Sequence, residues 1–365
     1  MALANLLCEI SDEYDVTLAI FNPRGPFLER LPAGVHLLKL SPLTQVLGMS
    51  YADCMKYGSL LQKIFKLFGA AWTKLFSNNL FVALALAFQK NVGEYDVVIS
   101  YHHETAAKTS VTGFGKFALK KCKAAKRIAW VHADFIATNL GTPGNLKTYR
   151  QFDKIISVSR TAMESFLVAY PSLKDKCDYC YNPLPVDKIV EQGNAASNLF
   201  IKSEDEVVLF SACRLAKEKG LVPALENLIP VFEKNQNLKW FIAGSGPEET
   251  RLRSVILENH LQERVILLGF VQNPYPYMKN ADYLFLPSLH ETFGMVVGEA
   301  HVLGTPVIAS DIPVMHEVLG PSDYICTNND YAAVIASLLD DNTHNQKSVE
   351  FCLPKWKDQF ERVLE

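Results

Sequence analysis

The stretch LPSLHETFGMVVGEAHVLGT, from Leu286 to Thr305, decides how this chain is interpreted. The apolar run from Asp282 to Leu286 leads into a polar loop, and the segment from Met295 to Leu303 has the composition of a helix. A strand, a loop and a helix in this order form the ligand-binding edge of open α/β sheets. The unpaired N–H groups at the start of such a helix, around Phe293 to Val296, are suited to an anion such as a phosphate.

Two carboxylates, Glu291 and Glu299, flank Gly294 within this stretch. They are eight residues apart, which is about 12 Å along the axis if the intervening residues are helical. Paired carboxylates of glycosidases stand roughly 5 to 9.5 Å apart, so the spacing disfavours a hydrolytic acid and base pair. Carboxylates beside an anion site indicate a ligand with hydroxyl groups as well as phosphate. A sugar nucleotide fits this description.

Along the whole chain, short β-branched or apolar runs alternate with longer segments of helical spacing. The runs are 16–21, 35–40, 96–100, 127–132 and 154–158 in the first half, and 207–212, 238–243, 265–268, 283–286, 306–309 and 323–326 in the second. This alternation predicts a parallel, doubly wound α/β sheet in each half. The segment from Met1 to Tyr14 has a helical pattern, so we expect the N-terminal domain to lack its first strand.

The pattern predicts two Rossmann-like domains facing a cleft. We place an N-terminal domain at 1–185, a linker at 186–205, and a C-terminal domain at 206–350. Residues 351–365 are expected to form a helix that packs back on the N-terminal domain.

The composition excludes several classes of function. A formal net charge of −3 and a pI near 6.3 provide no global basic surface for nucleic acid. Eight cysteines are scattered through the chain and no signal peptide precedes them, so a reduced, cytoplasmic protein is expected. Cys177 and Cys180 form a CxxC, but no second pair stands at zinc-finger spacing.

The segment 61–88 has a basic amphipathic pattern, with Lys63, Lys66 and Lys74 on an apolar background. Two interpretations stay open. The segment forms either a pair of helices that cover a sheet, with the lysines in solvent, or a surface that lies on the inner face of an anionic membrane.

The second half resembles the donor domain of family-4 retaining glycosyltransferases, which have the two-domain GT-B architecture. The segments that carry the resemblance are SACRLAKEKGL at 211–221, FIAGSGPEETRL at 241–252, VILLGFVQN at 265–273 and HETFGMVVGEAHVLGTPVIAS at 290–310. The first half is similar to the family more weakly, through EYDVVISYH at 94–102, RIAWVHADF at 127–135, FDKIISVSRTAMESF at 152–166 and YNPLPVD at 181–187.

The resemblance implies roles for individual residues. Arg214 and Lys219 are expected to clamp the diphosphate, as two cations in a loop after a strand can do. Glu299 would bond the ribose hydroxyls, Glu291 would approach the transferred sugar, and His132 would contact the donor sugar or phosphate. The remaining candidates are His102 and Asp134 on the acceptor side, and Gly244, Gly246, Val271, Phe293, Gly294, Met295 and Val296 on the donor side.

The GSG turn at Gly244 and Gly246 supports two interpretations equally, a close approach to a ligand or a purely structural turn. As a dinucleotide fingerprint it fails, because Glu249 stands where the third glycine of GxGxxG belongs. This disfavours a nicotinamide-dependent oxidoreductase. Lys217 and Glu218, in the loop of Arg214, are interpreted as solvated charges.

The implied reaction is transfer of a hexosyl group from a nucleotide-diphosphate sugar to a hydroxyl of a glycan or lipid-linked acceptor, with retention and same-face attack. Bacterial-type surface polysaccharide synthesis is the expected setting. No metal and no other cofactor are expected, because the two cations take the part of a divalent ion. Other classes remain: a catalytically impaired nucleotide-sugar-binding protein, a GT-B epimerase or phosphorylase, and a membrane-surface binding protein.

Overall fold

The computed structural model describes residues 2–25, 28–29, 31–75, 78–104, 113–195, 202–203, 205–340 and 356–365. The chain divides into two compact units. The first comprises Met1–Pro183 and Lys355–Glu365, and the second comprises Leu184–Pro354.

The second unit is built around one six-stranded sheet in which all neighbouring strands are parallel. Its order is β12-β11-β10-β7-β8-β9. Chain order therefore runs outward in both directions from β7, and it reverses between β7 and β10. The strands are β7 (Val207–Ala212), β8 (Leu238–Ala243), β9 (Val265–Gly269), β10 (Tyr283–Leu286), β11 (Val307–Ser310) and β12 (Tyr324–Cys326).

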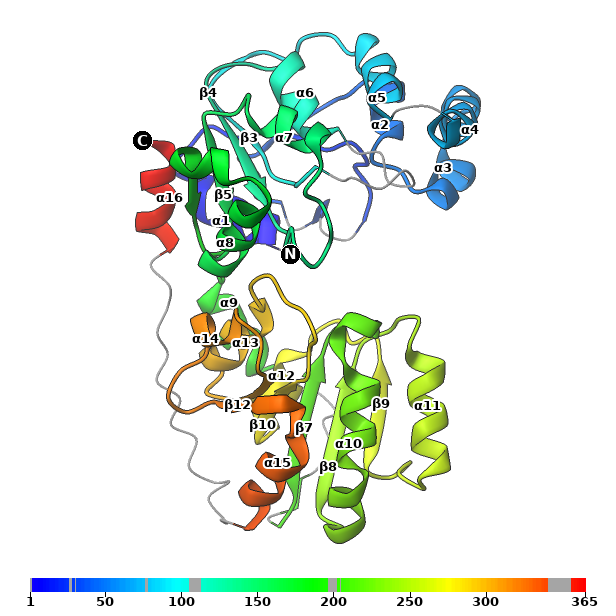
Figure 1. Cartoon of the computed structure of the whole chain (residues 1–365), viewed down its shortest axis with the longest axis vertical. Helices are drawn as coiled ribbons and strands as arrows, with labels where there is room; N and C mark the ends of the chain where they lie inside the picture. Colours follow the sequence, from blue (N-terminus) through cyan, green and yellow to red (C-terminus); the bar gives the residue numbers. More distant parts are fainter. Residues whose placement is uncertain are drawn as a thin grey trace. The chain divides into compact units, whose positions relative to one another are not determined.

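Helices cover both faces of this sheet, because successive strand residues point to opposite sides. Leu209 and Trp240 pack with helices α10, α11 and α15, and α10 and α15 lie side by side (Figure 1). Val208 and Phe241 pack on the other face with α12, α13 and α14. The helices are α10 (Leu221–Lys234), α11 (Glu249–Glu258), α12 (Tyr275–Asn280), α13 (Met295–Val302), α14 (Met315–Val318) and α15 (Tyr331–Asp340).

The six strands predicted for the second half are confirmed, each within one residue at either end. The predicted linker 186–205 differs from the structure in its first part. Val186–Gly193 form helix α9, which packs against α12 and α13. Its anchor is the buried Ile189, in a cluster with Leu184 and Tyr275. Residues 196–201 and 204 of that linker lie outside the described residues.

The first unit contains two parallel sheets. A two-stranded sheet pairs β1 (Thr17–Ala19) with β2 (His36–Leu38), and helix α1 (Ala2–Ile10) precedes it. A four-stranded sheet has the order β3-β4-β5-β6. It comprises β3 (Glu94–Ser100), β4 (Lys123–Val131), β5 (Lys154–Ser157) and β6 (Cys177–Tyr179). The sequence analysis missed β6, which has three half-buried residues and therefore no apolar run.

Two apolar clusters hold the helices of the first unit. Phe65 and Phe81, from α4 (Leu60–Leu75) and α5 (Asn78–Ala87), stack with 4.7 Å between ring centroids. Phe166 and Val131 belong to a second cluster, under α8. The remaining helices are α2 (Pro42–Val46), α3 (Tyr51–Tyr57), α6 (Phe114–Lys121), α7 (Pro143–Tyr149) and α8 (Arg160–Ala169).

The chain returns to the first unit at its C-terminal end. Helix α16 (Trp356–Leu364) places Phe360 6.1 Å from the ring of Trp130 on β4. Arg362 donates to both carboxylate oxygens of Asp178, at 2.9 and 3.0 Å. Helix α16 is therefore fixed to the four-stranded sheet (Figure 1). None of the helices in the described ranges is long and apolar enough to pass through a lipid bilayer.

Candidate active site

In the second unit, charged residues meet where the strand order reverses. The loop after β7 carries Lys219, and the loop after β10 carries Glu291. Their Nζ and Oε1 atoms are 2.5 Å apart. The Ser288 hydroxyl donates to the same carboxylate oxygen at 3.0 Å. The side chains of Lys219 and Glu291 are only 20% and 12% exposed, so solvent screens their attraction weakly. The structure thus brings two predicted site residues into direct contact.

Backbone contacts hold these two loops together. The N–H of Leu289 donates to the carbonyl of Glu218 at 2.9 Å. Gly220 has a φ of +63°, and a Cβ there would stand 2.0 Å from the carbonyl oxygen of Pro287. Only glycine fits such an approach without displacing the neighbouring loop. Lys219 is therefore held at a fixed position beside the end of β10.

Arg214, the other predicted cation, pairs with Glu218 rather than with Glu291. A backbone hydrogen bond and the Arg214 guanidinium hold the pKa of Glu218 below its usual range. Glu218, which the sequence predicts to be a solvated charge, is 40% exposed and is the ion-pair partner of Arg214. The Arg214 side chain is 69% exposed, so this pair is weak and leaves the guanidinium accessible to an anion.

Glu299 is buried on α13, as its apolar surroundings predict. Glu299 is 5% exposed. The Tyr275 hydroxyl donates a long hydrogen bond of 3.4 Å to Glu299 Oε1. Burial raises the pKa of the Glu299 carboxyl to about 7, and the Tyr275 hydrogen bond opposes this shift. A buried carboxylate with one weak donor among the described residues is suited to accept further hydrogen bonds from a ligand's hydroxyl groups.

Helix α13 begins after Gly294, which has a φ of +75°. Because only 295–302 are helical, the helical separation assumed for Glu291 and Glu299 does not apply. Phe293 is buried. The other three predicted donor contacts also have packing roles: Met295 lies against the α9 cluster, and Val296 and Val271 pack against the core beneath the sheet.

The structure explains why glycine stands at positions 244 and 246. A Cβ on Gly244 would stand 1.8 Å from the Cys213 carbonyl oxygen, and one on Gly246 would stand 2.3 Å from that of Leu215. Gly244 also has a φ of +147°. Both glycines therefore let the loop after β8 pack against the loop after β7. On the side where a side chain would project, protein backbone occupies the space.

In the first unit, His132 follows β4 and is half-buried. Its ring centroid is 4.6 Å from that of Tyr101. Burial, with smaller contributions from His102 and His103, lowers the pKa of His132 to about 3. Its Nε2 atom is buried without a hydrogen-bond partner among the described residues. His132 is therefore a neutral imidazole at ordinary pH.

The two predicted acceptor-side residues differ in character. His102 is exposed, stacks on His103 at 4.4 Å, and has its Nδ1 2.8 Å from the His103 carbonyl oxygen. Asp134 Oδ1 accepts from the N–H groups of Ile136 and Ala137 at 2.9 and 3.0 Å, and from the Ser165 hydroxyl. These local bonds fix the turn after β4, so this oxygen of Asp134 has a structural role.

A comparison with known families gives this geometry its context. Residues 195–351, which make up most of the second unit, match the model described as "Glycosyl transferases group 1". The second unit is a group 1 glycosyl transferase domain. Its Lys219–Glu291 contact lies at the reversal of strand order, where open α/β sheets bind ligands.

Curated relatives of this transferase domain carry related names. The chain is 28% identical over 180 residues to the O-antigen biosynthesis glycosyltransferase WclY of Escherichia coli, covering 49% of this chain and 48% of that protein. It is 30% identical over 166 residues to a Campylobacter jejuni N-acetylgalactosaminyltransferase named for a diphospho-undecaprenol substrate, covering 45% and 42%. The chain thus spans about half the length of the curated relatives it matches.

Solved structures show the fold beyond the transferase domain. Anabaena HepE, crystallised with UDP and glucose, aligns with a TM-score of 0.65 at 16% identity over 100% of this chain and 94% of that one. The lipopolysaccharide galactosyltransferase WaaB aligns with a TM-score of 0.58 at 15% identity, also over 100% and 94%. Both likenesses support two Rossmann-like α/β domains.

Sequence reasoning missed Ser288 and Tyr275, the hydrogen-bond partners of Glu291 and Glu299 in the transferase domain. Ser288 stands three residues before Glu291, and it was detectable as a polar residue at the end of an apolar strand. Tyr275 is far from Glu299 in the chain and no local pattern connects them.

The CxxC residues have no sign of metal chemistry. Burial raises the pKa of both Cys177 and Cys180 to about 12, so both are thiols rather than thiolates at neutral pH. Within the described part of the chain, no group of three His, Cys, Asp or Glu side chains is arranged to hold a metal ion.

Proposed function

We propose that this chain is a retaining glycosyltransferase that moves a sugar from a nucleotide-diphosphate sugar to a hydroxyl of a glycan or lipid-linked acceptor in surface polysaccharide synthesis. The observation that carries the proposal is the shielded Lys219–Glu291 contact at the strand-order reversal of a group 1 glycosyl transferase domain. The names of WclY and of the Campylobacter relative support the acceptor class.

In this proposal the second unit binds the donor. Lys219 and Arg214 neutralise the diphosphate, which carries the developing charge as the glycosidic bond breaks. An ammonium group has three N–H donors, so Lys219 keeps Glu291 oriented while it also binds a phosphate oxygen. Glu299 accepts the ribose hydroxyl groups. These cations supply the electrostatic stabilisation, and the reaction requires no metal ion.

We assign His132 of the first unit to the transferred sugar. Its neutral ring and buried Nε2 without a partner suit a hydrogen bond with a sugar hydroxyl. The assignment uses His132 as a positioning group, since neutral imidazole cannot protonate a leaving group.

We also propose contact with an anionic membrane surface through α4 and α5. Both helices expose apolar side chains at helical spacing: Leu60, Leu61, Ile64, Leu67 and Phe68 on α4, and Leu80 and Leu84 on α5. Exposed apolar stripes of this kind can enter the headgroup region of a bilayer. Lys66 belongs to neither a solvent-facing nor a membrane-facing set of charges, because its Nζ donates to the carbonyls of Val46 and Met49. The side chain of Lys74 lies outside the described residues.

The experiment that tests the proposed function is incubation with a panel of radiolabelled nucleotide sugars and undecaprenyl-diphosphate-linked glycans, followed by analysis of the anomeric configuration of the product by NMR. Transfer with retention supports the proposal. Tight nucleotide binding without transfer favours the impaired binding protein. Nucleotide-sugar turnover without any acceptor, or glycan cleavage by inorganic phosphate, favours an epimerase or a phosphorylase.

A further inference from the structure

Two cations of the first unit lie over the same tyrosine ring. The guanidinium carbon of Arg24 is 4.8 Å from the centroid of the Tyr57 ring, and Nζ of Lys56 is 4.9 Å from it. Arg24 also donates to the Tyr57 carbonyl at 3.2 Å. Lys56 and Tyr57 end helix α3, whereas Arg24 lies in the loop after β1. Two separate segments of the chain therefore bring two positive charges to one place.

These two charges are not compensated within the described chain. Arg24 and Lys56 are exposed, and their contacts with described residues include no carboxylate. Asp53, one turn before Lys56 on α3, accepts from the Ser50 hydroxyl at 2.7 Å. Attraction to the ring holds each cation in place, but the two cations repel each other. An anion bound at this ring would relieve the repulsion.

Two lysines of α4 add positive charge at the same place. Burial raises the pKa of the Cys54 thiol, and Lys66, Lys63 and Arg24 each oppose this shift. All three cations therefore lie close enough to act on one thiol of α3. Lys66 is already bound to two backbone carbonyls, so Lys63 is the lysine of this pair that can serve an anion. Arg24, Lys56 and Lys63 together form the cation cluster.

Exposed apolar side chains begin three residues after Tyr57. Leu60, Leu61 and Ile64, at the start of α4, are each more than half exposed, and Lys63 stands among them in the sequence. Positive charge next to exposed apolar side chains matches a ligand with an anionic group at the end of a hydrocarbon chain. A nucleotide or free phosphate would leave the apolar side chains uncovered.

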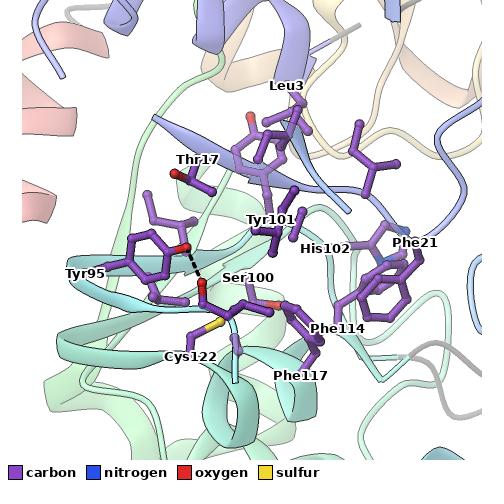
Figure 2. A pocket seen from close by; sticks show the side chains of 18 of the residues that line it. Leu3, Thr17, Phe21, Tyr95, Ser100, Tyr101, His102, Phe114, Phe117 and Cys122 are labelled. Carbon is purple, nitrogen blue, oxygen red and sulfur yellow. Dashed lines mark hydrogen bonds between the residues drawn. The ribbon is translucent and has the colours of Figure 1, made fainter. Parts of the chain in front are cut away.

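The loop of Arg24 lies beside the end of β3. The ring of Phe21, three residues before Arg24, is 4.6 Å from that of Phe114, which is 5.1 Å from that of His102. Figure 2 shows these three side chains together on one side of a pocket of about 460 Å³. Two packed rings thus connect the loop of the cation cluster to His102, the exposed residue predicted for the acceptor side.

We propose that the cation cluster binds the phosphate groups of a lipid-linked acceptor, with the hydrocarbon chain of the lipid along Leu60, Leu61 and Ile64. This inference rests on the proposed function, and it narrows the acceptor to a glycan joined to its lipid through phosphate. The planar guanidinium of Arg24 donates paired hydrogen bonds to phosphate oxygens, and the two ammonium groups act as point charges. The glycan then extends from the phosphate toward His102.

The probe is farnesyl diphosphate, which carries a diphosphate and a short hydrocarbon chain without a glycan. Calorimetry measures its Kd for the full chain, for the double variant Arg24→Gln and Lys56→Gln, and for Lys120→Gln, which removes an exposed lysine of α6. All three proteins also carry Lys219→Ala, so that the proposed donor site does not contribute. The double variant should bind about tenfold or more weakly, since it loses two charge-assisted contacts, and the control should bind unchanged. Equal Kd values for all three proteins, or no binding to any, would overturn the proposal.

Two further ligands separate a lipid-linked acceptor from other anions. Inorganic pyrophosphate lacks the chain and should bind more weakly than farnesyl diphosphate. If it binds as tightly, the cluster takes anions generally and the lipid-linked assignment is excluded. Vesicles of phosphatidylglycerol and phosphatidylcholine test bulk membrane lipid. If the double variant loses flotation but keeps its affinity for farnesyl diphosphate, the cluster binds bulk lipid and the proposal fails.

The binding measurement is independent of sugar transfer. Binding of farnesyl diphosphate through the cation cluster without transfer to any acceptor would contradict the proposed function and support the lipid phosphate site. Transfer to a lipid-linked glycan by the double variant with the parent's KM for that acceptor would support the proposed function and contradict the site.

Discussion

Lys219 and Glu291 stand 2.5 Å apart although 72 residues separate them in the sequence. The contact joins the loops after β7 and β10, the two strands between which chain order reverses. Because both side chains are largely shielded from water, the pair fixes the position of a cation at the point where the proposed diphosphate binds. Glu291 is held by the same contact and by Ser288.

Arg214 provides a prediction that separates catalysis from folding. Arg214→Ala should lower kcat by about 10²-fold or more, the scale observed when one transition-state charge contact is removed. Glu218→Ala should retain most activity, because it removes only the exposed partner of Arg214. Lys217→Ala, at an exposed position in the same loop, is the matched control. Steady-state kinetics on the three variants measure kcat. A kcat of Arg214→Ala within twofold of the parent value would contradict the prediction.

Glu299 makes the stability of the second unit depend on pH. Its folded pKa is raised from 4.5 to about 7, so the folded state keeps a proton that the unfolded state releases in this range. Stability therefore falls as pH rises from 4.5 to 7, by about 3 kcal/mol for this group at most. Glu299→Gln should flatten this part of the profile. Urea unfolding at pH 5 and pH 8 measures the effect, and parallel profiles for the two proteins would count against it.

His132 should make the stability of the first unit depend on pH in the opposite direction to that of Glu299. Its folded pKa is lowered from 6.5 to about 3, so only the unfolded state takes up the proton as pH falls below 6.5. Stability contributed by a neutral His132 is then lost progressively toward pH 3. In NMR spectra, the His132 ring should not titrate between pH 5 and pH 8, with His132→Gln used to assign its signals. A titration midpoint near 6.5 would refute the neutral ring.

Membrane contact is predicted to depend on the exposed face of α4. Vesicles of phosphatidylglycerol and phosphatidylcholine should carry the protein upward in a flotation gradient. The triple variant Leu61→Ser, Ile64→Ser and Phe68→Ser should stay in the protein fraction, since it loses the apolar side chains that enter the bilayer. Leu257→Ser, on the exposed face of α11, is the control. Equal flotation of the triple variant would exclude this face.

The sequence predicts the second unit well for a physical reason. Its strands are buried on both faces, so β-branched and apolar residues such as those of Val207–Ala212 form continuous runs. In the first unit, β6 has only three half-buried residues, and its pairing depends on long-range contacts. The sequence does not predict helix α9, because its eight residues are too few to show a clear hydrophobic periodicity, although Ile189 is fully buried.

For the candidate site, the sequence predicts the types of residue better than it predicts which of them contact each other. Motifs predict Arg214, Lys219 and Glu291 as candidate site residues. The sequence does not reveal that Glu291 pairs with Lys219 and that Glu218 pairs with Arg214. The partner of Glu299, Tyr275, lies on another helix. The burial that lowers the pKa of His132 also comes from packing, which a residue pattern does not report.

The central claim is that Lys219 binds the diphosphate of a nucleotide sugar. Thermal unfolding of the full chain with a panel of nucleotide sugars, UDP-glucose among them, tests it most directly for the parent, Lys219→Ala and Lys217→Ala proteins. We predict that at least one nucleotide sugar raises the Tm of the parent and of Lys217→Ala by several degrees through mass action, and leaves that of Lys219→Ala unchanged. Stabilisation of Lys219→Ala equal to that of the parent, or no stabilisation of any protein, would contradict the account.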